Sequence, residues 1–388
     1  MRNLLFISEM KDMKADASST QIMTYNLLYG LKEAGYCVTF LAVCNDACDT
    51  ESVVADFSPI VADVQCVPSA MNLLSRKRSI LSKYTVQLRY ALFNRWYRQR
   101  ADRLRLQETY DAILTHLPAI ESAYYARALR RRFPKARYLQ YWSDPYARSG
   151  LSAREKLSAK RCVMRFMEKR ILKEADSIAY GTPLLRETQA REYPQLARRM
   201  RFCHVSYNVY TGDTDRTPVF SDGRRLIGYV GGYRSTYRNI DPLYAAMRDH
   251  PELGNLVLCG FSDVSREEKD NIRIIQRCSP QRAVGVEEQL DIHVCLLNMT
   301  MSQIPGKIFY QANSGKPILV ILDGPDKEVI RTYLESFDRF EFAENTEEDI
   351  CRALDQIVHG RYTASLTSPE SLTPVSFARS ILQAGELA

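Results

Sequence analysis

Short apolar runs alternate with helix-like segments along this chain, and the alternation occurs twice. Near the start, the run "LLFIS" (4–8) precedes a Ser-x-x-Gln helix start at Ser18, and the run "YCVTFLAV" (36–43) follows that helix. The same order restarts at "RLIGYVGGY" (225–233) and continues with "GNLVLCGF" (254–261). Continuous apolar runs separated by helices are typical of parallel strands that are buried on both faces. The sequence therefore predicts an α/β fold.

The restart also predicts how the chain is divided. Residues 211–224 are rich in Asp, Thr, Pro, Ser and Gly, which is a linker composition, and 388 residues are enough for two domains. We expect two Rossmann-like domains that face each other across a cleft, at residues 1–210 and 211–370. A C-terminal helix within 371–388 is expected to pack back on the first domain. A cleft between two such units is a common place for a ligand.

The first candidate site follows the apolar run that ends at residue 230. In open parallel sheets, ligands bind beyond the carboxyl ends of the strands. Gly231 and Gly232 permit a tight turn and a close approach of the backbone, and Arg234 and Arg238 follow at positions suited to a diphosphate. The alternative is a tight turn with exposed arginines.

The second candidate site is the stretch "SQIPGKIFYQANSGKPILVI" (302–321). Pro305 suits the first position of a helix, and Gly306 lets another group approach the backbone. Lys307 adds positive charge to a helix end that already carries about +0.5 of a charge. Gly315 ends the helix ahead of the apolar run. A cationic helix start favours a phosphate, and the alternative is an ordinary helix start with a solvated lysine.

These two stretches carry a family resemblance. "RLIGYVGGYRSTYRNIDPLYAAM" followed by "DIHVCLLNMTMSQIPGKIFYQANSGKPILVI" resembles the C-terminal half of nucleotide-sugar glycosyltransferases with the GT-B fold, near glycosyltransferase family 4. The match is good over 225–322, moderate over 1–45 and 165–213, and poor between them. The resemblance rests on the order and spacing of the motifs. The resemblance implies transfer of a sugar from a nucleotide-diphosphate donor to a glycan or lipid-linked acceptor in surface polysaccharide biosynthesis.

The resemblance also implies a donor site. By position it consists of Gly231, Gly232, Arg234, Arg238, Gly306, Lys307 and Tyr310. Arg238 takes the basic position that holds the diphosphate, with Arg234 as the competing register. Diphosphate is the leaving group, so cations beside it would stabilise charge that grows in the transition state. The nucleotide sugar is a co-substrate, and the resemblance implies neither a metal ion nor another cofactor.

The catalytic residues are carried over in the same way. His116 lies where the family often has a histidine facing the donor sugar, and the alternative is a histidine that ends a buried strand. Asp144 is a candidate for acceptor contact or a turn former. Asp16 is the candidate base of an inverting mechanism or a solvated loop residue. Ser302 and Tyr310 stand where many relatives carry two glutamates, which leaves the ribose contact and the stereochemistry unassigned.

A basic segment distinguishes the first half of the chain. The net charge is +7, and residues 76–105 hold ten Lys and Arg against one Asp. Arg89, Arg95, Trp96 and Arg98 lie within a predicted helix there. Basic and aromatic side chains together suit an anionic membrane surface, where each charge contributes about 1 kcal/mol. The alternative is a solvated helix with its aromatics in the core.

The remaining signals mainly exclude other classes of protein. The ten cysteines include no CxxC pair, which predicts reduced thiols, and no apolar run is long enough for a signal peptide or a membrane span. We therefore expect a cytoplasmic protein, peripheral on the plasma membrane. No RRM, KH or helix-turn-helix signature appears, so no nucleic-acid partner is expected. A polyanion-binding protein, a nucleotide-sugar epimerase and a catalytically silent relative remain the alternatives.

Overall fold

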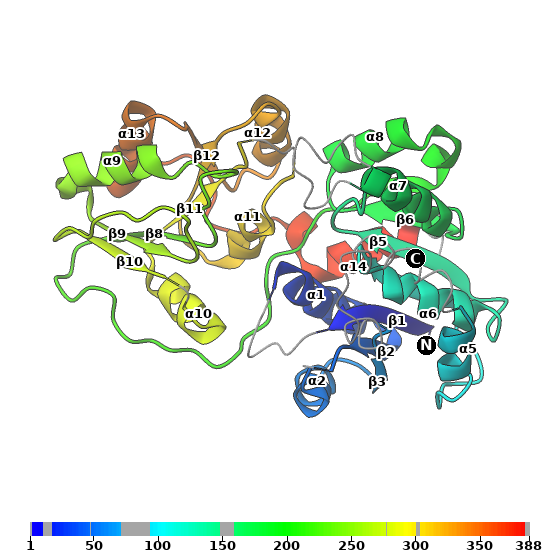
Figure 1. The fold of residues 1–388 in the computed structure, drawn as a ribbon. Coiled ribbons are helices and arrows are strands. Elements are labelled where there is room, and N and C mark those ends of the chain that lie inside the picture. The colour runs from blue at the N-terminus through cyan, green and yellow to red at the C-terminus, as the bar shows by residue number, and fades with distance from the viewer. Residues whose placement is uncertain are drawn as a thin grey trace. The chain divides into compact units, whose positions relative to one another are not determined.

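The protein divides into two compact units, each described here by itself (Figure 1). The first comprises Met1–Met13, Thr20–Val205 and Pro374–Ala388, and the second comprises Lys14–Ser19 and Ser206–Thr373. The computed structural model describes residues 2–10, 18–46, 48–70, 94–147, 159–276, 278–299 and 303–384.

The first unit is built on a seven-stranded parallel sheet in the order β3-β2-β1-β4-β5-β6-β7. Its central strands are almost completely buried, as their continuous apolar sequences predict. Leu4 of β1 pairs with Val38 on one side and with Ala112 on the other, which places the first apolar run in the middle of the sheet. The strands are β1 (Asn3–Met10), β2 (Cys37–Cys44), β3 (Asp63–Pro68), β4 (Ala112–Leu117), β5 (Arg137–Trp142), β6 (Ser177–Tyr180) and β7 (Met200–Phe202).

Helices cover both faces of this sheet. On one face, Leu5 and Ile7 belong to a core that includes Tyr97, Leu129 and Ile171 from three different helices. The chain also returns to this unit at its C-terminal end, where the last helix joins it. The helices are α1 (Ser19–Glu33), α2 (Thr50–Phe57), α5 (Asn94–Ala101), α6 (Ile120–Arg130), α7 (Ala159–Leu172), α8 (Pro183–Glu192) and α14 (Pro374–Ala384), with a 3₁₀ helix at Pro194–Arg199.

The second unit contains a six-stranded parallel sheet in the order β10-β9-β8-β11-β12-β13. This is the strand order of a doubly wound nucleotide-binding sheet, and the order reverses between the neighbours β8 and β11. The strands are β8 (Leu226–Val230), β9 (Asn255–Cys259), β10 (Ile272–Ile275), β11 (Ile292–Leu296), β12 (Ile318–Leu322) and β13 (Glu341–Glu344). Its helices are α9 (Asp241–Asp249), α10 (Pro280–Gln289), α11 (Gly306–Tyr310), α12 (Lys327–Glu335) and α13 (Glu347–Val358), with 3₁₀ helices at Pro251–Leu253, Gln311–Asn313 and Glu370–Leu372.

Alternate residues of β8 enter two different cores. Ile227 and Tyr229 pack with the core under α9 and α13, while Leu226 and Val230 pack with the core under α10. Figure 1 shows α9 and α13 on one face of the sheet and α10 on the other. Gly228 faces α10, and a Cβ atom there would lie 2.3 Å from a methyl group of Leu290, so this close approach requires glycine.

The prediction of an α/β fold with two parallel sheets is confirmed. Two details differ from the expected elements. In the basic segment, the helix that carries Arg95 and Arg98 ends at Ala101, and Leu104 and Leu106 follow it outside the helix and pack against the core. The short helix of the second candidate site begins at Gly306, so Pro305 precedes it rather than opening it. No helix in the described part of the chain is long and apolar enough to cross a membrane.

Candidate functional site

A pocket in the second unit lies at the carboxyl ends of β8 and β11, where the strand order reverses. Its volume is about 360 Å³. Most of the lining comes from four segments: β8 with the loop after it, the C-terminal end of α10, the strand β11 with the loop after it, and α11 with its flanking residues. Open parallel sheets generally bind their ligands at this position. The lining includes Gly231, Gly232, Tyr237, Arg238, Cys295, Asn298, Gln303, Pro305, Gly306 and Lys307.

The loop after β8 turns at Gly231. This residue has φ +156°, a conformation that side chains rarely adopt, and its N–H donates to the carbonyl of Cys259 at 2.8 Å. The turn places the backbone of Gly231 and Gly232 in the pocket wall, where added Cβ atoms would lie 3.2 Å from Tyr229 Oη and from Tyr237 Oη, respectively. The two glycines therefore contribute backbone without side chains to the pocket wall.

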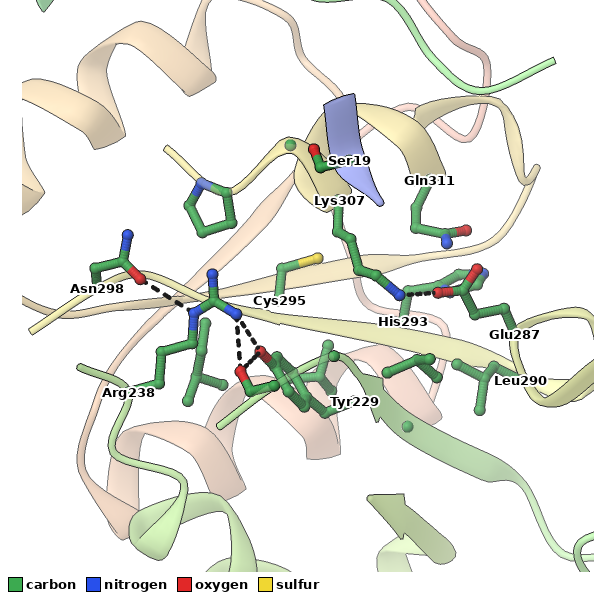
Figure 2. Close-up of a pocket in the computed structure, with 18 of the residues that line it drawn as sticks. Ser19, Tyr229, Arg238, Glu287, Leu290, His293, Cys295, Asn298, Lys307 and Gln311 are labelled. Carbon is green, nitrogen blue, oxygen red and sulfur yellow. Dashed lines mark hydrogen bonds and ion pairs between the residues drawn. The ribbon is translucent and has the colours of Figure 1, made fainter. Parts of the chain in front are cut away.

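Arg238 is held in the pocket by three acceptors (Figure 2). Its Nε donates to Asn298 Oδ1 at 3.1 Å, and its Nη1 donates to Tyr229 Oη and to the carbonyl of Gly232, each at 2.8 Å. Figure 2 shows the third nitrogen, Nη2, pointing away from these acceptors. Burial raises the pKa of Tyr229, with the nearby Arg238 opposing that shift, so the phenol stays neutral. The guanidinium is thus fixed in place without a carboxylate partner among these three groups.

Lys307 is the second cation of the pocket. Its Nζ lies 2.6 Å from Glu287 Oε1 of α10, and 42% of the Lys307 side chain is exposed against 19% of Glu287. Burial opposes the charge on Lys307, but Glu287 outweighs burial and raises the pKa of the ammonium. Lys307 is therefore cationic at neutral pH. The ion pair bridges α10 and α11 across the pocket (Figure 2).

The other end of the pocket contains His293 of β11, beside Leu290 and Gln311. His293 is 3% exposed, and its Nε2 has no hydrogen-bond partner among the described residues. Burial, aided by Lys316 and other nearby cations, lowers the pKa of His293 to about 3, so the ring is neutral. A buried polar atom without a partner is uncommon in native proteins. His293 therefore contributes a neutral ring with a buried, unpaired nitrogen to the residues that line the pocket.

Five of the predicted donor residues line this pocket together: Gly231, Gly232, Arg238, Gly306 and Lys307. The other two lie outside the lining. Arg234 is exposed, and its guanidinium carbon lies 4.5 Å from the centre of the Phe261 ring. Tyr310 is buried at the end of α11. Of the two arginines, Arg238 lines the pocket and Arg234 does not.

The predicted catalytic histidine lies in the first unit. His116 occupies the penultimate position of β4 and is fully buried, with Nδ1 2.8 Å from Thr24 Oγ1, which in turn lies 3.0 Å from Ser8 Oγ. Its Nε2 has no hydrogen-bond partner in the described part of the chain. Burial lowers the pKa of His116 to about 3, so the imidazole is neutral. Asp144 is half-buried, two residues after the end of β5.

Three of the predicted positions, Asp16, Arg89 and Ser302, lie outside the described residues. The rest of the predicted membrane surface is on α5, where Arg95 and Arg98 are exposed. Trp96 is half-buried and packs against the core, and the guanidinium of Arg100 lies 4.8 Å from its ring. The tryptophan ring therefore contributes to the core under α5.

Several pocket residues are not predicted by the sequence, among them Tyr229, Glu287, His293 and Asn298. Asn298 follows β11 by two residues, so the carboxyl-end rule alone would have found it. Tyr229 and His293 lie inside apolar strands, and Glu287 lies on the polar surface of a helix. None of these three carries a local signal. Within the described ranges, no group of three or more His, Cys, Asp and Glu side chains is placed to hold a metal ion.

Comparison with known proteins shows similarity in structure only. No protein-family model matches this sequence, and no curated protein matches it significantly. Among solved structures, the catalytic domain of starch synthase IV from Arabidopsis thaliana, bound to ADP and acarbose, has 10% identity and a TM-score of 0.61, covering 100% of this chain and 98% of that one.

Two further structures show the same similarity. UDP-GlcNAc 2-epimerase from Neisseria meningitidis, bound to UDP-GlcNAc, has 10% identity and a TM-score of 0.53, covering 99% of this chain and 98% of that one. The glycotransferase of kitacinnamycin has 15% identity and a TM-score of 0.51, covering 99% of this chain and 95% of that one. With its two parallel sheets of seven and six strands, this chain has the two-domain α/β fold known as GT-B.

Proposed function

We propose that this protein is a glycosyltransferase whose donor, a nucleotide-diphosphate sugar, binds in the pocket of the second unit. One observation carries the proposal: Arg238 is fixed by three hydrogen bonds at the carboxyl ends of β8 and β11, with the Lys307 ammonium in the same pocket. Preorganised cations stabilise negative charge that develops on a leaving diphosphate without further rearrangement. The fold comparisons support this reading, since two of the similar proteins were solved with ADP or UDP-GlcNAc.

The other pocket residues receive roles from their chemistry. Gly231 and Gly232 carry no side chains, which allows a phosphate to approach their backbone closely. Arg238 Nη2 donates to the diphosphate, because its Nε and Nη1 are already committed to protein acceptors. Glu287 holds the Lys307 ammonium in the pocket. His293 Nε2 supplies a hydrogen bond to a polar atom of the donor.

The first unit is proposed to bind the acceptor, a glycan or lipid-linked precursor of a surface polysaccharide. Residues 1–205 and 374–388 hold 35 Lys and Arg against 21 Asp and Glu, which suits an anionic membrane surface as the source of a lipid-linked acceptor. His116, neutral at physiological pH, remains our candidate for the group beside the sugar and would act through hydrogen bonding rather than charge. Asp144 and Asp16 remain candidates for contacting and deprotonating the acceptor.

A donor panel tests the activity. The protein is incubated with UDP-, GDP-, ADP- and dTDP-sugars and a polyprenyl-diphosphate glycan acceptor, and released nucleoside diphosphate and glycosylated product are measured. We expect one donor class to react only when acceptor is present, and Arg238→Met to lose at least a hundredfold in kcat/KM. Epimerised sugar nucleotide without transfer would identify an epimerase. Turnover unaffected by Arg238→Met would contradict the proposed site.

We also expect transfer without a metal ion. Two side-chain cations, Arg238 and Lys307, already line the pocket in which the diphosphate is proposed to bind. Transfer rates measured with excess EDTA should therefore equal those measured without it. A rate that falls to background in EDTA and returns with added Mg²⁺ would show that the two side chains do not suffice.

A further inference from the structure

Two cysteines of the second unit lie in contact beside the pocket. Cys259 is the last residue of β9, and Cys278 lies two residues before α10. Their sulfur atoms are 2.7 Å apart, about 0.7 Å more than the ~2.0 Å of a disulfide bond. Both are free thiols, and both lie outside the set of residues that line the pocket. A bond between them therefore needs only a small displacement.

We propose that Cys259 and Cys278 form a reactive dithiol that peroxides oxidise reversibly to a disulfide. Cys278, which is partly exposed, is the attacking thiol, and the fully buried Cys259 is the resolving thiol. This assignment goes beyond the proposed transferase activity and does not depend on it.

The surroundings of the pair favour a thiolate at Cys278. The hydrogen bond with Cys259 lowers the pKa of Cys278 to about 7, partial burial opposes this, and the nearby cations Lys307 and Arg282 assist it. The same hydrogen bond, together with burial, raises the pKa of Cys259. Since the thiolate is the nucleophile, Cys278 reacts first. Glu287 of α10 is paired with Lys307.

The chemistry of the pair balances in two steps. The Cys278 thiolate attacks one oxygen of hydrogen peroxide, the O–O bond breaks, and hydroxide leaves, giving a sulfenic acid. The Cys259 sulfur then attacks the Cys278 sulfur, the S–O bond breaks, and water leaves with the proton of the Cys259 thiol. Two thiols lose two electrons, and one peroxide becomes two waters after hydroxide takes a proton. A dithiol reductant reverses the bond by exchange.

The disulfide would join two elements that support the pocket. The carbonyl of Cys259 accepts the N–H of Gly231 at 2.8 Å, and Gly231 is part of the pocket wall. On the other side, Cys278 adjoins Ser279, which caps α10 by accepting the N–H of Arg282 at 3.1 Å. The same helix carries Glu287, the partner of Lys307. Oxidation of the dithiol would therefore link the segment that holds the glycine turn to the start of α10.

The first unit offers a matched control pair, Cys44 and Cys66. These two thiols also share a hydrogen bond, which lowers the pKa of Cys66 while burial opposes it. The cations Lys307 and Arg282 assist the lowered pKa of Cys278, whereas neither acts on Cys66. The exposed Cys162 serves as a control for a solitary thiol.

The test uses the full-length protein, reduced and then freed of reductant. It is pulsed with hydrogen peroxide at pH 7, alkylated, digested with trypsin and examined by mass spectrometry. Cleavage at arginine places Cys259 in the peptide 249–266 and Cys278 in the peptide 278–282, so a bond between them links two separate peptides. We expect this linked peptide to form at least ten times faster than a Cys44–Cys66 bond, which lies within the single tryptic peptide 33–76 and is detected there by fragmentation. The linked peptide should disappear with dithiothreitol.

Two variants separate the roles of the sulfurs. Cys278→Ser should form no sulfenic acid at either position, whereas Cys259→Ser should accumulate one at Cys278, detected with dimedone. Circular dichroism confirms that both variants are folded. The proposal is overturned if folded wild-type protein gives no 259–278 link, or if Cys278 reacts with peroxide no faster than Cys162.

Discussion

At the scale of single residues, two arginines four positions apart illustrate what a sequence can and cannot rank. Arg234 and Arg238 follow the same glycine pair, and either spacing suits a diphosphate. Packing separates them, because Arg238 finds three acceptors on β8, on its own loop and after β11, while Arg234 stacks on Phe261 at the surface. Two of these acceptors, Tyr229 and Asn298, become neighbours only when β8 and β11 pair.

The buried histidines predict how stability depends on pH. The folded-state pKa of His116 is about 3, below the ordinary value of about 6.5 that applies to the unfolded chain. The contribution of neutral His116 to the free energy of unfolding is therefore fully present above pH 6.5. It is lost progressively as the pH falls from 6.5 towards 3. At pH 5 the loss is about 2 kcal/mol. The His116→Asn variant keeps a neutral polar group at this position. Between pH 7.5 and pH 5, its free energy of unfolding should fall by about 2 kcal/mol less than that of the wild type.

Urea unfolding of the first unit at the two pH values measures this difference. His293, with the same low pKa in the second unit, provides the comparison, because His293→Asn should change the pH dependence of the second unit's transition instead. Equal losses in the wild type and in His116→Asn would show that His116 takes up a proton in the folded state.

At the scale of elements, the long apolar strands were easier to predict than edge strands whose apolar patterns are interrupted. The runs that became β1, β2, β8, β9 and β12 are buried along nearly their whole length, so their sequences are continuously apolar. Edge strands such as β3 and β13 are partly exposed, so polar residues interrupt their patterns. Glu287 on α10 contributes to the pocket through tertiary packing alone.

The packing of α1 against α14 gives a test at this scale. A Cβ atom at Gly30 of α1 would lie 2.0 Å from the carbonyl oxygen of Pro374, the first residue of α14. Gly→Ala in a helix interior ordinarily stabilises by up to about 1 kcal/mol. Here we expect the clash to prevail, so that Gly30→Ala destabilises the first unit by about 1–3 kcal/mol.

The exposed Glu33 on the same helix provides the control. Glu33→Ala should change the free energy of unfolding by less than about 0.5 kcal/mol. Chemical denaturation of the wild type and both variants makes the comparison. If Gly30→Ala proves as stable as Glu33→Ala, α14 does not pack on α1 as described.

At the scale of the whole molecule, charge is divided unevenly along the chain. Residues 206–373 hold 18 Lys and Arg against 25 Asp and Glu, so the acidic excess there contrasts with the basic excess of the remainder. A basic surface on one unit favours association with an anionic bilayer through that unit, in a manner that salt weakens.

Vesicle binding tests this division. Replacing the exposed Arg95 and Arg98 of α5 by Gln should weaken binding to vesicles containing anionic lipid by about 2 kcal/mol, roughly thirtyfold, at low ionic strength. The same change at the exposed Arg352 and Arg361 of the second unit is the control and should have little effect. Sedimentation with the vesicles measures both. Equal effects, or binding insensitive to salt, would argue against docking through α5.

The central claim is that the pocket at the ends of β8 and β11 holds the diphosphate of a nucleotide. Isothermal titration calorimetry with UDP, GDP, ADP and dTDP tests it most directly, using the wild type, Arg238→Met and Arg234→Met. We predict that one nucleoside diphosphate binds the wild type and Arg234→Met with affinities within about threefold. Arg238→Met should lose at least about tenfold, since a hydrogen bond to a charged group contributes about 1.5–3 kcal/mol. Equal binding by Arg238→Met, or no binding of any of the four by the wild type, would contradict the claim.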